Sequence, residues 1–159
     1  MTEFFLNNKK VKAKDDETIW TVAKREGIVL PHLCFADKPG YRADGNCRAC
    51  MVSIEGERVL AASCIRKPTE GMKVITNDER STKSRKMVLE LLVTDQPDRE
   101  TSHDPDSHFW NVASSVDVAK SRFDKREKTI VPCEDASHVA MSVNLCLLYT
   151  SDAADDSGC

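Results

Sequence analysis

The sequence predicts a small α+β fold of the β-grasp type, and three observations support this prediction. Two stretches have the pattern of β-hairpins, a short amphipathic helix lies between them, and a cysteine-containing loop separates that helix from the second hairpin. A helix that covers one face of a small sheet lets both elements bury their apolar sides. The length of 159 residues suits one such domain followed by an extension.

Five strands are predicted from short runs in which apolar and polar side chains partly alternate between turn residues. They lie at residues 3–6, 11–14, 51–54, 58–62 and 73–75. Residues 7–10 would turn the first hairpin, and residues 55–57 would turn the second. The second hairpin would return Cys64 to the side of Cys50.

Helices are predicted at residues 19–26 and 76–94. Residues 15–18 supply acidic and capping side chains before the first helix, and Gly27 is its expected C′ residue. Its apolar side would consist of Ile19, Trp20, Val22 and Ala23. In the second helix, Thr76 and Glu79 form a capping-box pattern. One face of that helix would carry Met87, Val88, Leu91 and Leu92.

Composition excludes several classes of function. The net charge is −3, from 23 basic and 26 acidic side chains, and no basic block with aromatic residues indicates nucleic-acid binding. The longest apolar run, at residues 87–93, is interrupted by Glu90 and is too short to span a membrane. Without a targeting segment we expect a cytoplasmic protein, and the seven cysteines suggest a reducing compartment, where thiols serve metals instead of forming disulfides.

Four of the cysteines have metal-binding spacing. Cys34, Cys47, Cys50 and Cys64 follow the pattern C-x12-C-x2-C-x13-C, within a stretch rich in turn residues. Four thiolates complete the two tetrahedra of a [2Fe–2S] cluster, so we predict such a cluster with these ligands. A structural zinc ion is an alternative, although zinc ribbons usually present two C-x-x-C pairs. A disulfide framework is a further alternative that would need an oxidising compartment.

Other polar residues have either a role near these cysteines or an ordinary surface role. Arg42, Arg48 and Arg66 could offset the negative charge of a cluster, or could be solvated surface residues. With four cysteines available, His32 is not expected to ligate the metal. His103 and His108 are predicted to be surface residues, and Cys133 is predicted to be a free thiol. No phosphate-binding loop, catalytic triad or acid–base pair is present, so we predict no catalytic residue.

The order of elements resembles a known family. The strings DETIWTVAKREGIVLPHLCF, GYRADGNCRACMVSIEGERVLAASC and IRKPTEGMKVIT resemble the N-terminal [2Fe–2S] ferredoxin-like domain of large electron-transfer subunits. Among these, the chain resembles in particular the alpha (large) subunit of NAD-dependent molybdenum or tungsten formate dehydrogenase. The similarity runs through MVLELLVTDQPDRETSHDPDSHFWNVA to SHVAMSVNL, about residues 3–145. It implies that the four spaced cysteines are the cluster ligands.

The resemblance also implies a parent enzyme. There, formate would be oxidised at a molybdenum or tungsten pterin in a later domain, with additional [4Fe–4S] clusters. Electrons would pass to partner diaphorase subunits that contain flavin and iron–sulfur clusters and reduce NAD. Quinone-oxidoreductase relatives follow the second helix with His-x3-Cys-x2-Cys-x5-Cys, whereas this chain has no cysteine between Cys64 and Cys133. The alternatives are a hydrogenase or NADH-quinone oxidoreductase large subunit, a free-standing ferredoxin and a zinc-binding interaction module.

These interpretations divide the chain into four parts. Residues 1–78 are expected to form the ferredoxin-like domain, and residues 79–97 a helix that packs against it. Residues 98–145 are expected to form an extended linker that leads to a missing [4Fe–4S] domain. Residues 146–159, CLLYTSDAADDSGC, resemble translated sequencing adapter, so we expect the natural sequence to stop at Leu145 and Cys146 and Cys159 not to be ligands.

Overall fold

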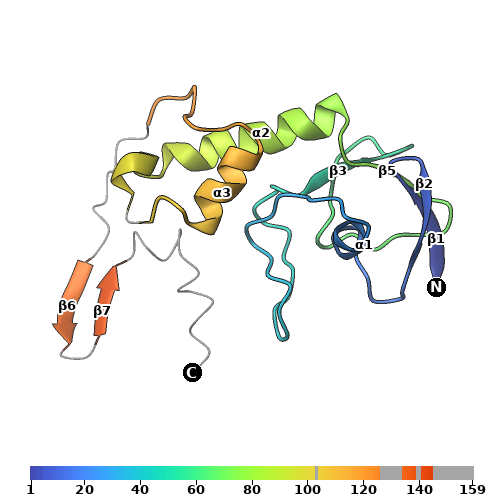
Figure 1. Cartoon of the computed structure of the whole chain (residues 1–159), viewed down its shortest axis with the longest axis horizontal. Helices are drawn as coiled ribbons and strands as arrows, with labels where there is room; N and C mark the ends of the chain where they lie inside the picture. The colour runs from blue at the N-terminus through green and yellow to red at the C-terminus, as the bar shows by residue number, and fades with distance from the viewer. Residues whose placement is uncertain (103, 126–133, 139–140, 145–159) are drawn as a thin grey trace. The chain divides into compact units, whose positions relative to one another are not determined.

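The computed structural model describes residues 1–102, 104–125, 134–138 and 141–144. The chain separates into two compact units, of which the first spans Met1–Leu89 and the second begins at Glu90. The first unit contains a five-stranded sheet and helix α1. Figure 1 shows α1 beside strands of this sheet.

The sheet of the first unit is mixed. Its strands are β1 (Thr2–Leu6), β2 (Lys9–Ala13), β3 (Met51–Ile54), β4 (Ala61–Ala62) and β5 (Lys73–Ile75). They are ordered β2-β1-β5-β3-β4, with β1 and β5 parallel and the other neighbours antiparallel. The last strand is therefore inserted between two hairpins, which is the β-grasp arrangement. The predicted α+β fold class is confirmed.

The first hairpin turns more tightly than the sequence predicted. Leu6 pairs with Lys9, so that only Asn7 and Asn8 lie in the turn, with φ angles of 49° and 67°. Two successive positive φ angles define the type I′ turn, whose twist matches that of the flanking strands, and asparagine tolerates this conformation.

Helix α1 (Ile19–Arg25) begins at the predicted residue and ends one residue before the predicted end, with Glu26 as its C-cap. Thr18 is the N-cap, and its hydroxyl accepts a hydrogen bond from the Thr21 N–H at 3.3 Å. Gly27 follows the helix with a φ angle of 78°, the left-handed conformation that glycine adopts at low cost. The four apolar side chains predicted for its inner side are all buried.

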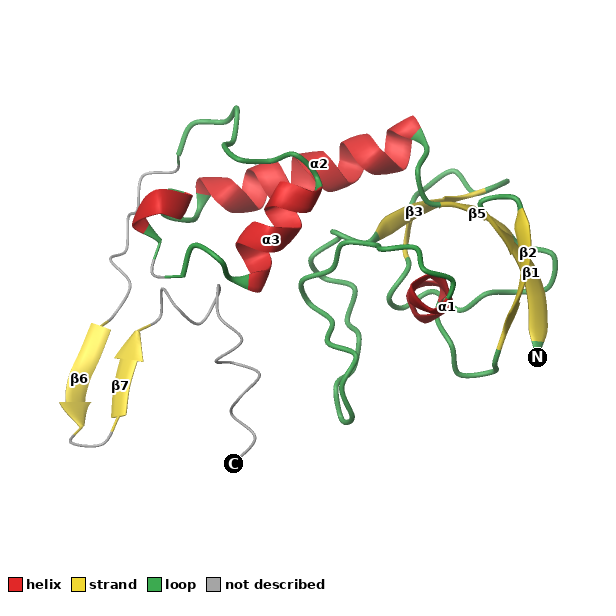
Figure 2. Cartoon of the chain, viewed as in Figure 1, coloured by secondary structure: helices red, strands yellow, loops and turns green. Residues whose placement is uncertain are grey.

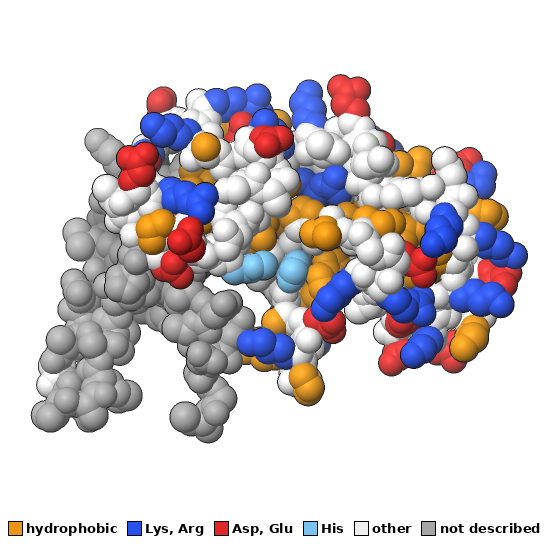
Figure 3. All heavy atoms as spheres, in the orientation of Figure 1, with side chains coloured by type: hydrophobic (Ala, Val, Ile, Leu, Met, Phe, Trp, Pro, Cys, Tyr) orange, Lys and Arg blue, Asp and Glu red, His pale blue; other side chains and the backbone are white. Residues whose placement is uncertain are grey.

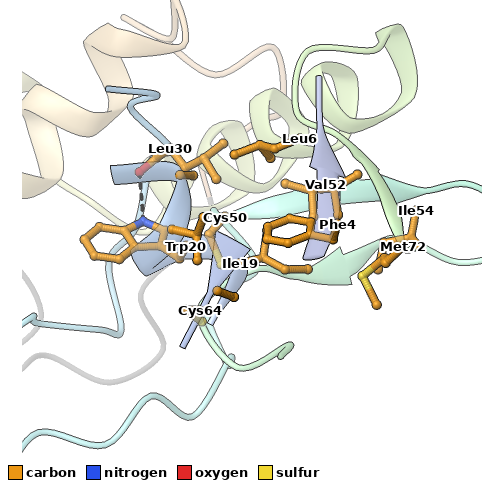
Figure 4. Close-up of a cluster of buried hydrophobic side chains, with 14 of the residues drawn as sticks. Phe4, Leu6, Ile19, Trp20, Leu30, Cys50, Val52, Ile54, Cys64 and Met72 are labelled. Carbon is orange, nitrogen blue, oxygen red and sulfur yellow. Dashed lines mark hydrogen bonds between the residues drawn. The ribbon is translucent and has the colours of Figure 1, made fainter. Parts of the chain in front are cut away.

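The core of the first unit lies between α1 and the sheet. Figure 4 shows large apolar side chains from both elements packed together, including those of Phe4, Leu6, Ile19, Trp20 and Val52. The indole N–H of Trp20 donates to the carbonyl oxygen of Leu30 at 3.2 Å, which ties the chain after α1 to this core. Trp20 is 5% exposed, so its prediction as a core residue is confirmed.

The second hairpin is shorter than predicted. Only Met51–Ala62 and Val52–Ala61 pair between β3 and β4, so residues 58–60 are not part of the strand. Val59 in this stretch is 65% exposed. A longer strand would be favoured if this side chain packed on an apolar face, and it packs little.

Helix α2 (Glu79–Thr94) lies where a helix was predicted, but its start and its buried side differ from the prediction. Its first turn is capped by Asp78, whose carboxylate accepts the N–H of Ser81 at 3.3 Å, and not by the predicted Thr76–Glu79 box. Met87 and Leu91 are 37% and 49% exposed, whereas the buried residues follow a spacing of four. These residues are Ser81, Arg85, Leu89 and Val93, and Glu90 beside them is buried as well.

The second unit contains secondary structure within the stretch that was expected to be an extended linker. Its elements are a 3-10 helix, η1 (Arg99–Thr101), helix α3 (His108–Ser115) and strands β6 (Glu134–His138) and β7 (Met141–Asn144). Helix α3 buries Phe109, Trp110, Val112 and Ala113. None of the helices in the described ranges is long and apolar enough to cross a membrane.

Candidate iron–sulfur centre

The four spaced cysteines reach the same end of the first unit from two segments. Cys34, Cys47 and Cys50 lie in the connection between α1 and β3, which contains no helix or strand (Figure 2). Cys64 follows β4 by two residues. The loop thus provides three thiols, and the second hairpin provides the fourth.

Cys50 and Cys64 form an inner pair. The pairing of β3 with β4 places the residues before Met51 beside those after Ala62. Ser63 completes this arrangement, because its N–H and its hydroxyl donate to the Cys50 carbonyl oxygen at 3.3 and 2.7 Å. The predicted return of Cys64 to the side of Cys50 is therefore confirmed. Both cysteines are 1% exposed and belong to the apolar core shown in Figure 4.

Cys34 and Cys47 form an outer pair that is half-buried. The N–H of Cys47 donates to the Cys34 sulfur at 3.4 Å, and the N–H of Ala49 donates to the Cys47 sulfur at 3.5 Å. Arg48, which lies between Cys47 and Ala49 in the sequence, has a φ angle of 57°, which is uncommon for a residue with a side chain. This turn aims two backbone N–H groups at sulfur, the arrangement that stabilises negative charge on thiolates.

Electrostatic coupling joins the inner pair. A hydrogen bond with the Cys64 side chain lowers the pKa of Cys50 to about 6, although burial opposes this shift. The same hydrogen bond, together with burial and the charges of the other three cysteines, raises the pKa of Cys64. Metal binding would favour the thiolate form of both side chains, because only the thiolate is a ligand.

The arrangement of the thiols in two pairs fits a two-iron cluster. Each iron of a [2Fe–2S] cluster takes two thiolates, so the cluster requires two neighbouring pairs, not one point where all four sulfurs meet. Among the described residues, no three His, Cys, Asp or Glu side chains converge tightly enough to hold a single metal ion. Four thiols are the kind and number of donors that two irons require.

Gly45 shapes the loop before the outer pair. Its φ angle is 67°, and a Cβ atom placed on it would lie 2.8 Å from Cδ1 of Ile65. Ile65 directly follows Cys64, so this close approach brings the loop against the segment that carries the fourth thiol. The turn chemistry predicted for residues 44–46 here serves a close contact as well as a change of direction.

The arginines predicted to offset the charge of a cluster lie at the surface. Arg42 pairs with Asp44 at 3.0 Å, Arg66 pairs with Glu57, and both of these arginines are exposed, as is Arg48. Their ordinary surface role, which the sequence left open, is the one that the structure supports.

Sequence reasoning missed Arg85, which lies on α2 and is buried near the inner pair. It donates to the carbonyl oxygen of Met51, the residue that follows Cys50. The available signal was its position four residues after Ser81 and four before Leu89, in phase with the buried side of the helix.

The remaining sequence candidates are histidines with other surroundings, or lie outside the described residues. The ring of His32 packs edge-on against Trp20 at a centroid distance of 4.7 Å. His108 is exposed, as predicted. Four candidates lie outside the described residues, namely His103, Cys133, Cys146 and Cys159.

Comparison with known families identifies the class of the first unit. Residues 1–79 match the family described as "2Fe-2S iron-sulfur cluster binding domain". The first half of the chain is therefore a [2Fe–2S] electron-transfer domain of the ferredoxin-like class. The binding of this type of cluster is confirmed at the level of the domain, and the assignment of its four ligands stays a prediction.

Individual relatives are subunits of larger redox enzymes. The chain is 35% identical over 100 residues to the NADP-reducing hydrogenase subunit HndD of Solidesulfovibrio fructosivorans. This match covers 61% of the chain and 17% of HndD. The chain is also 35% identical over 95 residues to the mitochondrial NADH-ubiquinone oxidoreductase 78 kDa subunit of Candida albicans, which covers 60% of this chain and 13% of the relative. The chain thus spans less than a fifth of the length of these curated relatives.

A solved structure extends the similarity beyond the first unit. The crystal structure of an NAD+-reducing [NiFe]-hydrogenase in the H2-reduced state superposes with a TM-score of 0.70 and 25% identity. The match covers 87% of this chain and 57% of the hydrogenase chain. These relatives are subunits of hydrogenases and of an NADH-ubiquinone oxidoreductase. They do not support the predicted likeness to formate dehydrogenase in particular.

Proposed function

We propose that Cys34, Cys47, Cys50 and Cys64 hold one [2Fe–2S] cluster through which the chain relays single electrons. The observation that carries this proposal is the grouping of the four thiols into a buried pair and a half-buried pair at one end of a β-grasp core. A bound cluster would supply a single accessible one-electron step.

The residues of the chain would insulate and position this group. The inner pair, Cys50 and Cys64, lies in the apolar core, which excludes water from one side of the site. The N–H groups of Cys47 and Ala49 would stabilise negative charge at the outer sulfurs. Because the outer pair is only half-buried, that side lies near solvent, where an electron donor or acceptor could approach.

We further propose that the parent protein is the large subunit of a multi-subunit NAD- or NADP-linked oxidoreductase. The names of the relatives support a hydrogenase or an NADH-quinone oxidoreductase. Such a parent would pass electrons between this cluster and partner subunits that bind flavin and further iron–sulfur clusters. A cytoplasmic location is part of the proposal.

Formate dehydrogenase is the second candidate for the parent. One sequence feature favours it, because no cysteine lies between Cys64 and Cys133. Relatives of the quinone-oxidoreductase type carry [4Fe–4S] ligands after the helix that corresponds to α2, and this chain lacks those ligands. In that parent, a molybdenum or tungsten pterin and additional [4Fe–4S] clusters would lie in other domains. Sequencing the genomic locus around this reading frame distinguishes the candidates by the domains that accompany it.

The relay function is tested by anaerobic reconstitution of the full chain with iron and sulfide. We expect about two irons and two sulfides per chain and a reversible one-electron reduction in a potentiometric titration. A zinc-binding module would instead retain zinc tightly and show no redox transition, and this result would contradict the proposal.

A further inference from the structure

Arg85 is the buried cation of the first unit that lies next to the candidate cluster site. Its side chain is 8% exposed, although arginine is almost never fully buried without partners. The guanidinium donates to the carbonyl oxygens of Thr76 at 2.7 Å and Met51 at 3.2 Å, and to the hydroxyl of Thr82 at 3.3 Å. These acceptors are neutral groups, so they accept hydrogen bonds from the guanidinium without balancing its positive charge.

The charge of Arg85 interacts with Cys50, one member of the inner pair. Burial lowers the pKa of Arg85, and the negative charges of Asp78 and Cys50 act in the opposite direction. An arginine begins so far above neutrality that it remains charged. Its contact with the Met51 carbonyl also fixes the backbone next to Cys50.

Other basic side chains of this unit differ from Arg85 in their surroundings. Figure 3 shows Lys and Arg side chains at the surface, interspersed with Asp and Glu. Several form ion pairs with exposed partners, such as Lys24 with Asp37 at 2.9 Å and Arg42 with Asp44 at 3.0 Å. Solvent and salt screen such pairs, whereas a buried charge is screened much less.

We propose that Arg85 raises the reduction potential of the cluster held by the neighbouring cysteines. The inference rests on the proposed function. A bound cluster would accept one electron from a reduced flavin or iron–sulfur donor without any bond being formed or broken, and the site would then carry one more negative charge. A fixed positive charge nearby favours the reduced state, in the same way that charge and hydrogen bonding adjust the potentials of iron–sulfur centres. Arg85 is thus a positioning residue that acts through the ligand segment.

The test compares three variants of the reconstituted full chain in potentiometric titrations followed by EPR. Arg85→Gln removes the charge and retains hydrogen-bonding capacity, whereas Arg85→Lys retains the charge and loses the planar fork. Arg80→Gln is the matched control, because Arg80 lies on the same helix and donates to a backbone carbonyl, that of Arg58, but is exposed.

We expect Arg85→Gln to shift the ratio of reduced to oxidised cluster about tenfold toward the oxidised state, equivalent to about 59 mV for a one-electron couple. Arg85→Lys should unfold at a lower urea concentration yet keep a potential close to that of the unmodified chain, and Arg80→Gln should leave the potential unchanged. An unchanged potential in Arg85→Gln with a full cluster signal would overturn the inference. If Arg85→Gln does not fold, a lowered potential in Arg85→Lys would overturn it, because the charge is still present. Failure of the unmodified chain to bind a cluster would instead refute the proposed function.

Discussion

Replacing Gly45 with alanine should weaken the loop that carries the outer cysteines, for two separable reasons. The backbone has a φ angle of 67°, and the left-handed conformation costs a residue with a Cβ atom about 1–2 kcal/mol. In addition, the new Cβ would lie 2.8 Å from Ile65 Cδ1, well inside the optimal carbon–carbon separation of about 3.5–4.0 Å. Moving the Ile65 side chain off its rotamer would cost about 0.5–1.5 kcal/mol more.

Gly40→Ala provides a matched control within the same loop. Gly40 also has a positive φ angle, 87°, but no atom lies within 4 Å of a Cβ placed there. Replacing Gly40 with alanine should therefore cost only the free energy of the left-handed backbone, without a clash with a neighbouring side chain. We expect Gly45→Ala to destabilise the folded chain by about 1 kcal/mol more than Gly40→Ala does, from the rotamer cost at Ile65.

The assay is anaerobic urea unfolding of the cluster-loaded chain, followed by tryptophan fluorescence and by loss of the visible absorption of the cluster. Ile65→Val removes Cδ1 and keeps Cγ1, which lies 3.3 Å from the added Cβ, so it should rescue part of the Gly45→Ala effect. A double-mutant cycle measures this coupling. Equal effects at Gly40 and Gly45, together with no rescue by Ile65→Val, would refute the argument that the contact constrains the loop.

Three further predictions concern the core and the start of α2. Trp20→Phe removes the donor to the Leu30 carbonyl at 3.2 Å and should lower the free energy of unfolding by about 1–3 kcal/mol; an unchanged urea midpoint would contradict this. Asp78→Ala removes the acceptor of the Ser81 N–H and of the Ser53 hydroxyl and should cost about 1 kcal/mol in the same assay. Burial would raise the pKa of Asp78, but hydrogen bonds from Ser81 and Ser53 keep it below its ordinary value. The stabilisation by Asp78 should therefore be complete above the pKa of an unfolded aspartate, about 3.9, and should be lost as the pH falls through the lower folded pKa. A deficit of Asp78→Ala that stays constant down to acidic pH would contradict this assignment.

Local patterns in the sequence predicted the first unit well. The two asparagines of the first hairpin, the threonine cap before α1 and Gly27 after it each act within a few residues, so their effect is visible without the fold. The cysteine spacing was similarly informative, because the chemistry of iron requires a fixed number of thiolates. The shorter β4 was harder to predict, since its length depends on whether Val59 finds an apolar surface.

Helix α2 shows why the rest could not be predicted from periodicity. Its buried side includes Ser81 and Arg85, and an apolar pattern therefore assigned the wrong side to Met87 and Leu91. The burial of Arg85 depends on a carbonyl oxygen of Met51, 34 residues earlier in the chain. Such a partner is brought near only by the tertiary fold, which also determines how the thiols divide into two pairs.

The EPR spectrum of the reconstituted full chain after dithionite reduction tests the central claim most directly, when it is compared with that of Cys64→Ser. If the four cysteines hold one [2Fe–2S] cluster, the unmodified chain should give a rhombic signal of about one unpaired electron per two irons. Loss of one thiol from the buried pair should abolish or strongly alter this signal. An EPR-silent chain, or a signal that is unchanged in Cys64→Ser, would contradict the account of the site.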